Sequence, residues 1–207
     1  MKSLLRPFVF VQFFLATSVA VAQGPNLLSA AALVLDARSG EPLYSKNANT
    51  VTPIASITKL MTAVVVLDAQ QNLDERLAVD MNDLDYLKAS HSRLSIGSEL
   101  SRREMLQLAL MSSENRAASA LGRYYPGGLA AAVKAMNAKA ASLGMTNTHY
   151  VDTTGLSPDN VSTARDLAVL VQAAQRYPLI REYSTQTDQY VQIPATGQTL
   201  HFNNSNA

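Results

Sequence analysis

Apolar and polar positions alternate near both ends of the chain and follow a helical period between them. Residues 31–35 and 42–45 alternate on either side of a Gly-containing segment, which predicts a β-hairpin. A second strand pair is predicted at 190–193 and 199–202, around Thr196-Gly197. Apolar residues at helical spacing predict helices at 53–69, 101–111, 115–125, 129–143 and 162–171, with a short one from Pro178.

This order of elements predicts an α+β fold. A hairpin comes first, then a mostly helical middle, and then the late strands. We expect a helical lobe beside an antiparallel sheet whose remaining strands come from late in the sequence.

Local signals set the ends of several predicted helices. The helix over 53–69 is apolar around most of its circumference, Ile57 included, so we expect it to be buried, with Ser56 in its first turn. Ser101-Arg102-Arg103-Glu104 has the pattern of a capping box. Ser112-Ser113 interrupts the helical pattern that follows, and Gly144 is a natural C-terminal cap.

Composition narrows the class of protein. The chain has 207 residues, 47% hydrophobic and 16% charged, with a net charge of +1, which fits one globular domain and predicts no nucleic-acid partner. Cysteine is absent, so the fold must rely on its core. His91, His149 and His201 lack the spacing of metal ligands, and we predict neither a metal nor a cofactor.

The first residues have the pattern of a secretory signal. Lys2 and Arg6 precede a mostly apolar run over 8–21, and Ala20-Val21-Ala22 is an A-x-A-type cleavage site. We therefore expect a signal peptide over 1–22, cleavage after Ala22, and a mature domain over 23–207 in the periplasm. The alternative is a retained membrane anchor, for which the run is short and contains several polar residues.

A serine and a lysine three residues apart are the main candidates for chemistry. On a helix, Ser56 and Lys59 share a face, which brings a hydroxyl within reach of an amine that can take its proton. Chance alone predicts about half a match to so short a pattern, and a helix-start serine with a solvated lysine is the alternative. Ser113-Glu114-Asn115 adds a Ser-x-Asn pattern at a helix break, where capping roles are also common; the pattern recurs at Ser45-Lys46-Asn47.

Several blocks together resemble the low-molecular-mass penicillin-binding proteins, the serine D,D-peptidases. The blocks are Ser56-Ile57-Thr58-Lys59-Leu60-Met61, Met111-Ser112-Ser113-Glu114-Asn115, Thr154-Gly155-Leu156-Ser157 and Ser162-Thr163-Ala164-Arg165-Asp166. Within that family the chain is most similar to the D-alanyl-D-alanine endopeptidase type, on Tyr125-Pro126-Gly127-Gly128 and on 134–140. The resemblance covers essentially all of the mature chain and implies a β-lactamase/D,D-peptidase-like fold.

The resemblance also implies a role for each candidate residue. Ser56 would attack the carbonyl of a D-alanyl peptide bond, Lys59 would take its proton, Ser113 would pass that proton to the leaving amine, and Asn115 would hold the substrate amide. Peptidoglycan stem peptides and their cross-links would be the substrates, and β-lactam antibiotics would acylate Ser56. Cell-wall hydrolases and synthases become candidate partners.

The sequence departs from the family pattern in its third motif, Lys-Thr-Gly. The chain stops at Ala207 without it, and the nearest match, Arg38-Ser39-Gly40, lies in the predicted hairpin turn. We therefore expect a truncated form that lacks the C-terminal strands and helix, with weak or no activity and exposed strand edges.

Two other functions remain open at this point. One is a catalytically inactive cell-wall-binding or partner-binding module that keeps only the cleft. The other is a serine β-lactamase, which is disfavoured because no Glu-x-x-x-Asn occurs in the chain to place a deacylating glutamate.

Overall fold

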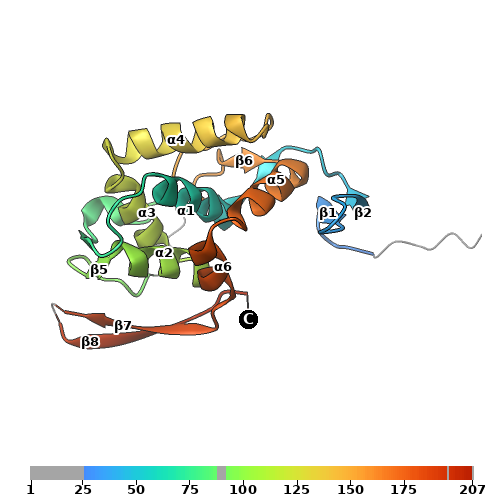
Figure 1. Cartoon of the computed structure of the whole chain (residues 1–207). Helices are drawn as coiled ribbons and strands as arrows, with labels where there is room; N and C mark the ends of the chain where they lie inside the picture. Colours follow the sequence, from blue (N-terminus) through green and yellow to red (C-terminus); the bar gives the residue numbers. More distant parts are fainter. Residues whose placement is uncertain (1–25, 88–91, 195, 207) are drawn as a thin grey trace, which may run out of the picture.

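The structure, a computed structural model, describes residues 26–87, 92–194 and 196–206 (Figure 1). The expected signal peptide and its cleavage site lie outside the described residues, as does His91. Within the described ranges, no helix combines the length and the apolar character needed to cross a membrane.

Six α-helices and two short 3-10 turns are present in the described part of the chain. The α-helices are α1 (Thr58–Asp68), α2 (Arg102–Met111), α3 (Asn115–Arg123), α4 (Gly128–Ser142), α5 (Ala164–Ala174) and α6 (Pro178–Thr185). The 3-10 turns are η1 (Ala55–Ile57) and η2 (Met81–Asp83). Every predicted helix exists, and the capping box of Ser101 with Glu104 is present at the start of α2.

The strands form four separate antiparallel pairs within the described residues. They are β1 (Ala32–Leu35) with β2 (Pro42–Lys46), β3 (Thr52–Pro53) with β6 (Val161–Ser162), β4 (Arg76–Ala78) with β5 (Glu99–Ser101), and β7 (Asp188–Ile193) with β8 (Gln198–Asn203). Both predicted hairpins are confirmed, with Val34 opposite Tyr44 and Val191 opposite Leu200. Arg38 and Ser39 lie in the turn between β1 and β2.

One expectation about the sheet was wrong. The late strands β7 and β8 pair with each other and do not extend the β1–β2 sheet. Figure 1 shows the two hairpins at different ends of the molecule, separated by the helices. The fold is nevertheless α+β, with a helical body and small antiparallel sheets.

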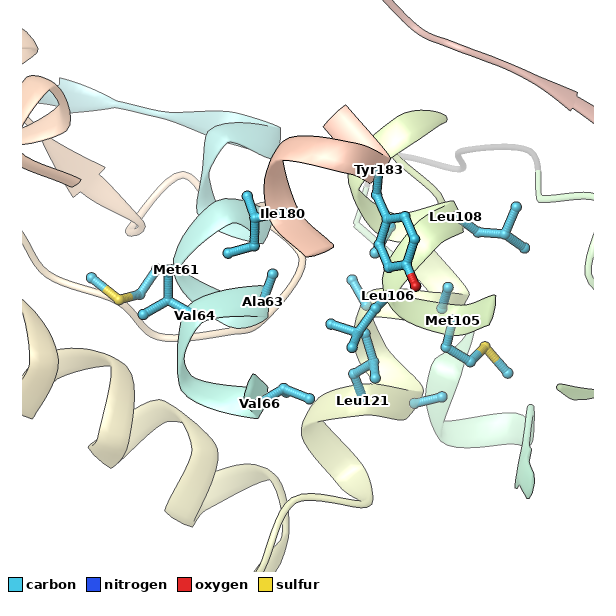
Figure 2. Packing of buried hydrophobic residues seen from close by; sticks show 14 of the residues in the cluster. Met61, Ala63, Val64, Val66, Met105, Leu106, Leu108, Leu121, Ile180 and Tyr183 are labelled. Carbon is cyan, nitrogen blue, oxygen red and sulfur yellow. The ribbon is translucent and has the colours of Figure 1, made fainter. Parts of the chain in front are cut away.

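The core lies where four helices meet. Figure 2 shows Val66 of α1 on the side toward Leu106 of α2 and Leu121 of α3, with side chains of α6 above them, and Val64 on the opposite side of α1. These four side chains are at most 1% exposed. At roughly 1.5–3 kcal/mol for each large apolar side chain buried, this cluster supplies much of the drive for folding and fixes α1 relative to α2 and α3.

The helix predicted to contain Ser56 begins later in the structure, after that residue. The expected helix over 53–69 is preceded by a strand and a 3-10 turn, and α1 proper starts at Thr58. Backbone groups of 52–54 are used elsewhere: β3 pairs with β6, and Ile54 N–H donates to the Asn160 carbonyl at 3.0 Å. Ile57 is also 47% exposed instead of buried, because it faces an apolar pocket of about 410 Å³ that Leu33 and Leu167 also line.

Candidate active site

The serine and the lysine of the first motif are in direct contact. Ser56 is exposed in the 3-10 turn η1, whereas Lys59 is 2% exposed in the first turn of α1. Lys59 Nζ lies 3.0 Å from Ser56 Oγ, within hydrogen-bond distance. A buried amine therefore faces an exposed hydroxyl, an arrangement in which the amine could take the proton of the hydroxyl.

A backbone carbonyl 95 residues away completes the surroundings of the lysine. Lys59 Nζ donates to the Thr154 carbonyl at 2.8 Å. One helical turn further along α1, Thr62 Oγ1 donates to the Thr153 carbonyl, also at 2.8 Å. Two consecutive carbonyls of the 153–154 segment thus accept from two side chains on one face of α1.

The second motif lies between α2 and α3. Ser113 has a left-handed backbone, with φ of +57°, and Asn115 is the first residue of α3. Glu114 is the N-cap of α3, and its side chain accepts from Arg116 N–H at 3.1 Å, so it serves the helix end. The last residue of the motif, Asn115, thus begins a helix that packs against α1, the helix of Lys59.

The other Ser-x-Asn match has a different environment. Ser45 is exposed on β2, and Asn47 follows that strand and donates to the Ala30 carbonyl at 2.8 Å. This pair belongs to the β1–β2 hairpin at one end of the molecule (Figure 1).

Backbone strain is present on both sides of the candidate site. A left-handed conformation at a non-glycine residue costs energy and persists only where its surroundings impose it. Ala55, directly before Ser56, has φ of +47°, and Ser113 has φ of +57°. Asn47 and Gln70 share the conformation elsewhere.

Sequence reasoning gave no role to Asp152, which begins a turn over 152–157. Asp152 accepts hydrogen bonds from Thr154 N–H at 2.7 Å, Gly155 N–H at 2.6 Å and Ser157 N–H at 2.9 Å. Burial alone would raise the pKa of Asp152, but these N–H groups outweigh it and hold that pKa below its usual value. The Asp-x-x-Gly pattern is a turn signal that could have located this segment.

Gly155 brings the turn onto the backbone beside the serine. Its φ is +83°, and a Cβ at this position would come 1.9 Å from the Ala55 carbonyl oxygen. Only glycine fits both the conformation and the contact. The turn over 152–157 therefore lies against the residue that precedes Ser56 and against the amine of Lys59.

Comparisons with known proteins identify the family of the chain. The family model described as D-alanyl-D-alanine carboxypeptidase matches residues 18–207. The chain is 50% identical over 206 residues to a D-alanyl-D-alanine endopeptidase of Pseudomonas aeruginosa, covering 96% of this chain and 66% of the relative. It is 51% identical over 185 residues to a D-alanyl-D-alanine endopeptidase of Escherichia coli, covering 89% of this chain and 60% of the relative.

Solved structures give the same result. A mutant of a Streptomyces DD-transpeptidase matches with a TM-score of 0.81 and 28% identity, over 89% of this chain and 76% of that one. A D-alanyl-D-alanine carboxypeptidase of Mycobacterium tuberculosis matches with a TM-score of 0.74 and 30% identity, over 92% and 70%. The chain thus spans about two thirds or less of the two endopeptidases, and it belongs to the D-alanyl-D-alanine carboxypeptidase family of serine D,D-peptidases.

Proposed function

We propose that the protein is a periplasmic serine D-alanyl-D-alanine endopeptidase, with carboxypeptidase activity on the same type of bond. Its substrates would be peptidoglycan stem peptides and the cross-links between them. The observation that carries the proposal is the 3.0 Å contact between the exposed Ser56 hydroxyl and the buried Lys59 amine. Membership of the family and the two endopeptidase relatives support the choice of substrate.

The proposed reaction has two halves. Ser56 Oγ attacks the D-alanyl carbonyl while its proton passes to Lys59 Nζ, and the proton then reaches the leaving amine by way of Ser113. The peptide C–N bond breaks and an ester on Ser56 remains. Water attacks this ester, gives a proton to the same relay and releases the acyl group as a carboxylate. Asn115 holds the amide of the substrate.

Two features of the site favour this sequence of steps. The Thr154 carbonyl can only accept, so it takes an N–H of Lys59, and the same nitrogen lies 3.0 Å from the Ser56 hydroxyl whose proton it would take as a neutral amine. The Ser56 N–H, at the start of a helical segment, would donate to the developing oxyanion, a contribution worth about 2.7–4 kcal/mol for one such donor. A β-lactam would acylate Ser56 by the same attack and stay bound.

Digestion of cross-linked muropeptides tests the proposal. The protein is produced from its natural gene, and we expect Ser56→Ala to lose cleavage by more than about 10³-fold, because the nucleophile is gone. Ser45→Ala is the matched control, since Ser45 belongs to the other Ser-x-Asn pattern, and it should cleave like the wild type. Equal cleavage by Ser56→Ala and the wild type would refute the proposal.

The muropeptide digestion and an assay of nitrocefin hydrolysis together separate the two alternatives. An inactive binding module would give no cleavage with either protein. A β-lactamase would hydrolyse nitrocefin over many turnovers without touching muropeptides.

Export is a second part of the proposal. It is supported by the positive start, the apolar run and Ala20-Val21-Ala22. N-terminal sequencing of the exported protein should start at Gln23; a protein that keeps Met1 would contradict cleavage.

A further inference from the structure

The carboxylate of Asp152 organises the turn that faces the lysine. Its Oδ1 accepts from the N–H groups of Thr154 and Gly155 and from the Thr154 hydroxyl, the last at 3.0 Å, while its Oδ2 accepts from Ser157 N–H. A single side chain therefore satisfies three backbone donors within six residues. Charge-assisted hydrogen bonds of this kind are stronger than neutral ones, so they define the shape of the turn.

The position of Asp152 is itself fixed by a buried side chain. Asn160 is fully buried, and its Oδ1 accepts from Val151 N–H at 2.8 Å and from Asp152 N–H at 3.3 Å. The Asn160 carbonyl in turn accepts from Ile54, two residues before Ser56. Asn160 thus connects Asp152 to the segment that leads into Ser56.

Carbonyl groups of the turn accept hydrogen bonds from side chains of α1. The N–H and the hydroxyl of Thr154 are both bound to Asp152, and its carbonyl accepts from Lys59 Nζ at 2.8 Å. Gly155 packs on the carbonyl of Ala55. Asp152 therefore reaches Lys59 through one residue, Thr154, whose polar groups are all engaged.

We propose that Asp152 is a positioning residue for the candidate base: by holding Thr154, it places the Thr154 carbonyl where it orients Lys59 Nζ toward Ser56 Oγ. This inference rests on the proposed function, in which Lys59 takes the serine proton. Asp152 touches neither of those atoms in the hydrogen bonds described above, so it acts through the turn.

The kinetic test measures acylation of Ser56 by a fluorescent penicillin in the protein produced from its natural gene. Asp152→Ala should lower the acylation rate constant by about 10²-fold, because a misplacement of about 1 Å in a catalytic group has an effect of that size. The dissociation constant of the initial non-covalent complex should stay within about twofold, since Asp152 does not line the approach to Ser56 in this account. A purely structural role would lower the fraction of active protein without lowering the rate constant of the active fraction.

Two further variants make the test specific. Asp152→Asn can keep the Oδ1 acceptor for Thr154 and Gly155 but not the Oδ2 acceptor for Ser157, so its rate should lie between those of the wild type and Asp152→Ala. Asp159→Asn removes the same charge from the same loop, where Asp159 is exposed and accepts from the Ser157 hydroxyl at 3.4 Å. It should acylate at the wild-type rate.

A crystal structure of Asp152→Ala gives a readout that does not depend on activity. We expect the separation of Lys59 Nζ and the Thr154 carbonyl oxygen to exceed about 3.5 Å, the limit of a hydrogen bond. A retained contact in Asp152→Ala would overturn the inference, as would wild-type acylation by that variant or an equal loss in Asp159→Asn. If the wild type forms no acyl-enzyme, the proposed function fails, and the crystal structure alone then decides whether Asp152 positions Lys59.

Discussion

At the scale of single residues, the absence of a side chain at Gly155 is as important as the presence of Ser56 and Lys59. The turn can lie on the Ala55 carbonyl only because residue 155 has no Cβ. That contact and the Lys59–Thr154 hydrogen bond come from neighbouring residues of the same turn. The position of the candidate base and the conformation of the chain before Ser56 are therefore linked.

Gly155→Ala should be destabilising beyond its backbone strain. An alanine with φ near +83° costs about 1–2 kcal/mol, and the forced contact adds about 1–3 kcal/mol. Gly97→Ala is a matched control, since Gly97 has φ of +84° with nothing within 4 Å of an added Cβ. Urea unfolding of both variants should show that Gly155→Ala loses at least about 1 kcal/mol more; equal losses would contradict the close approach.

Sequence reasoning named the side chains of the candidate site but not the backbone groups that the structure places against them. Ser56 and Lys59 are recognisable as a candidate pair because residues three apart on a helix share a face. The Thr154 carbonyl cannot be recognised as a partner of Lys59, because every residue has a carbonyl and the contact spans 95 positions. Asp152 was overlooked for a related reason, as an aspartate before a glycine is typical of ordinary turns.

At the scale of elements, the site depends on how α1, α3 and the 152–157 turn are joined. Thr62 of α1 donates to the Thr153 carbonyl, and Thr153 Oγ1 donates to the Ala118 carbonyl of α3 at 3.0 Å. All three side chains are at most 1% exposed, so these bonds form away from competing water. Thr153 thus ties the turn to both helices that carry the candidate motifs.

A capping box stabilises the start of α2, the helix that precedes Ser113. Ser101 Oγ accepts from Glu104 N–H at 3.2 Å, and Glu104 Oε2 accepts from Ser101 N–H at 2.7 Å. Ser101→Ala should cost about 1 kcal/mol of unfolding free energy, whereas Ser101→Gly should cost only a few tenths. Ser142→Ala, in the exposed last turn of α4, should change it by less than about 0.5 kcal/mol. Urea denaturation measures all three, and equal effects of Ala and Gly at position 101 would argue against the cap.

Elements with strong periodicity or caps could be predicted, and the shortest ones could not. The helices and both hairpins were found because several residues contribute to each pattern. The pairs β3–β6 and β4–β5 escaped because strands of two or three residues carry no period, and their partners are distant in sequence. The same pairing explains why α1 begins at Thr58, since β3 takes up the backbone that the helical pattern had claimed.

At the scale of the whole molecule, a helical body presents the serine, and the two hairpins lie at different ends of it (Figure 1). The body packs α1 against α2, α3 and α6 (Figure 2), and Lys59 of α1 is 2% exposed. The fold class could be predicted from the order of the elements. The separation of β7–β8 from β1–β2 could not be predicted, because tertiary contacts decide which strands pair. The family model and the relatives place this body in the D-alanyl-D-alanine carboxypeptidase family.

The central claim is that Ser56 is the nucleophile, and mapping a covalent adduct tests it most directly. The protein, produced from its natural gene, is incubated with benzylpenicillin, and its intact mass and proteolytic peptides are measured by mass spectrometry. We expect one penicilloyl group per chain, located on Ser56, and none in Ser56→Ala. An adduct located on another residue, Ser113 included, or an unmodified wild-type protein would contradict it.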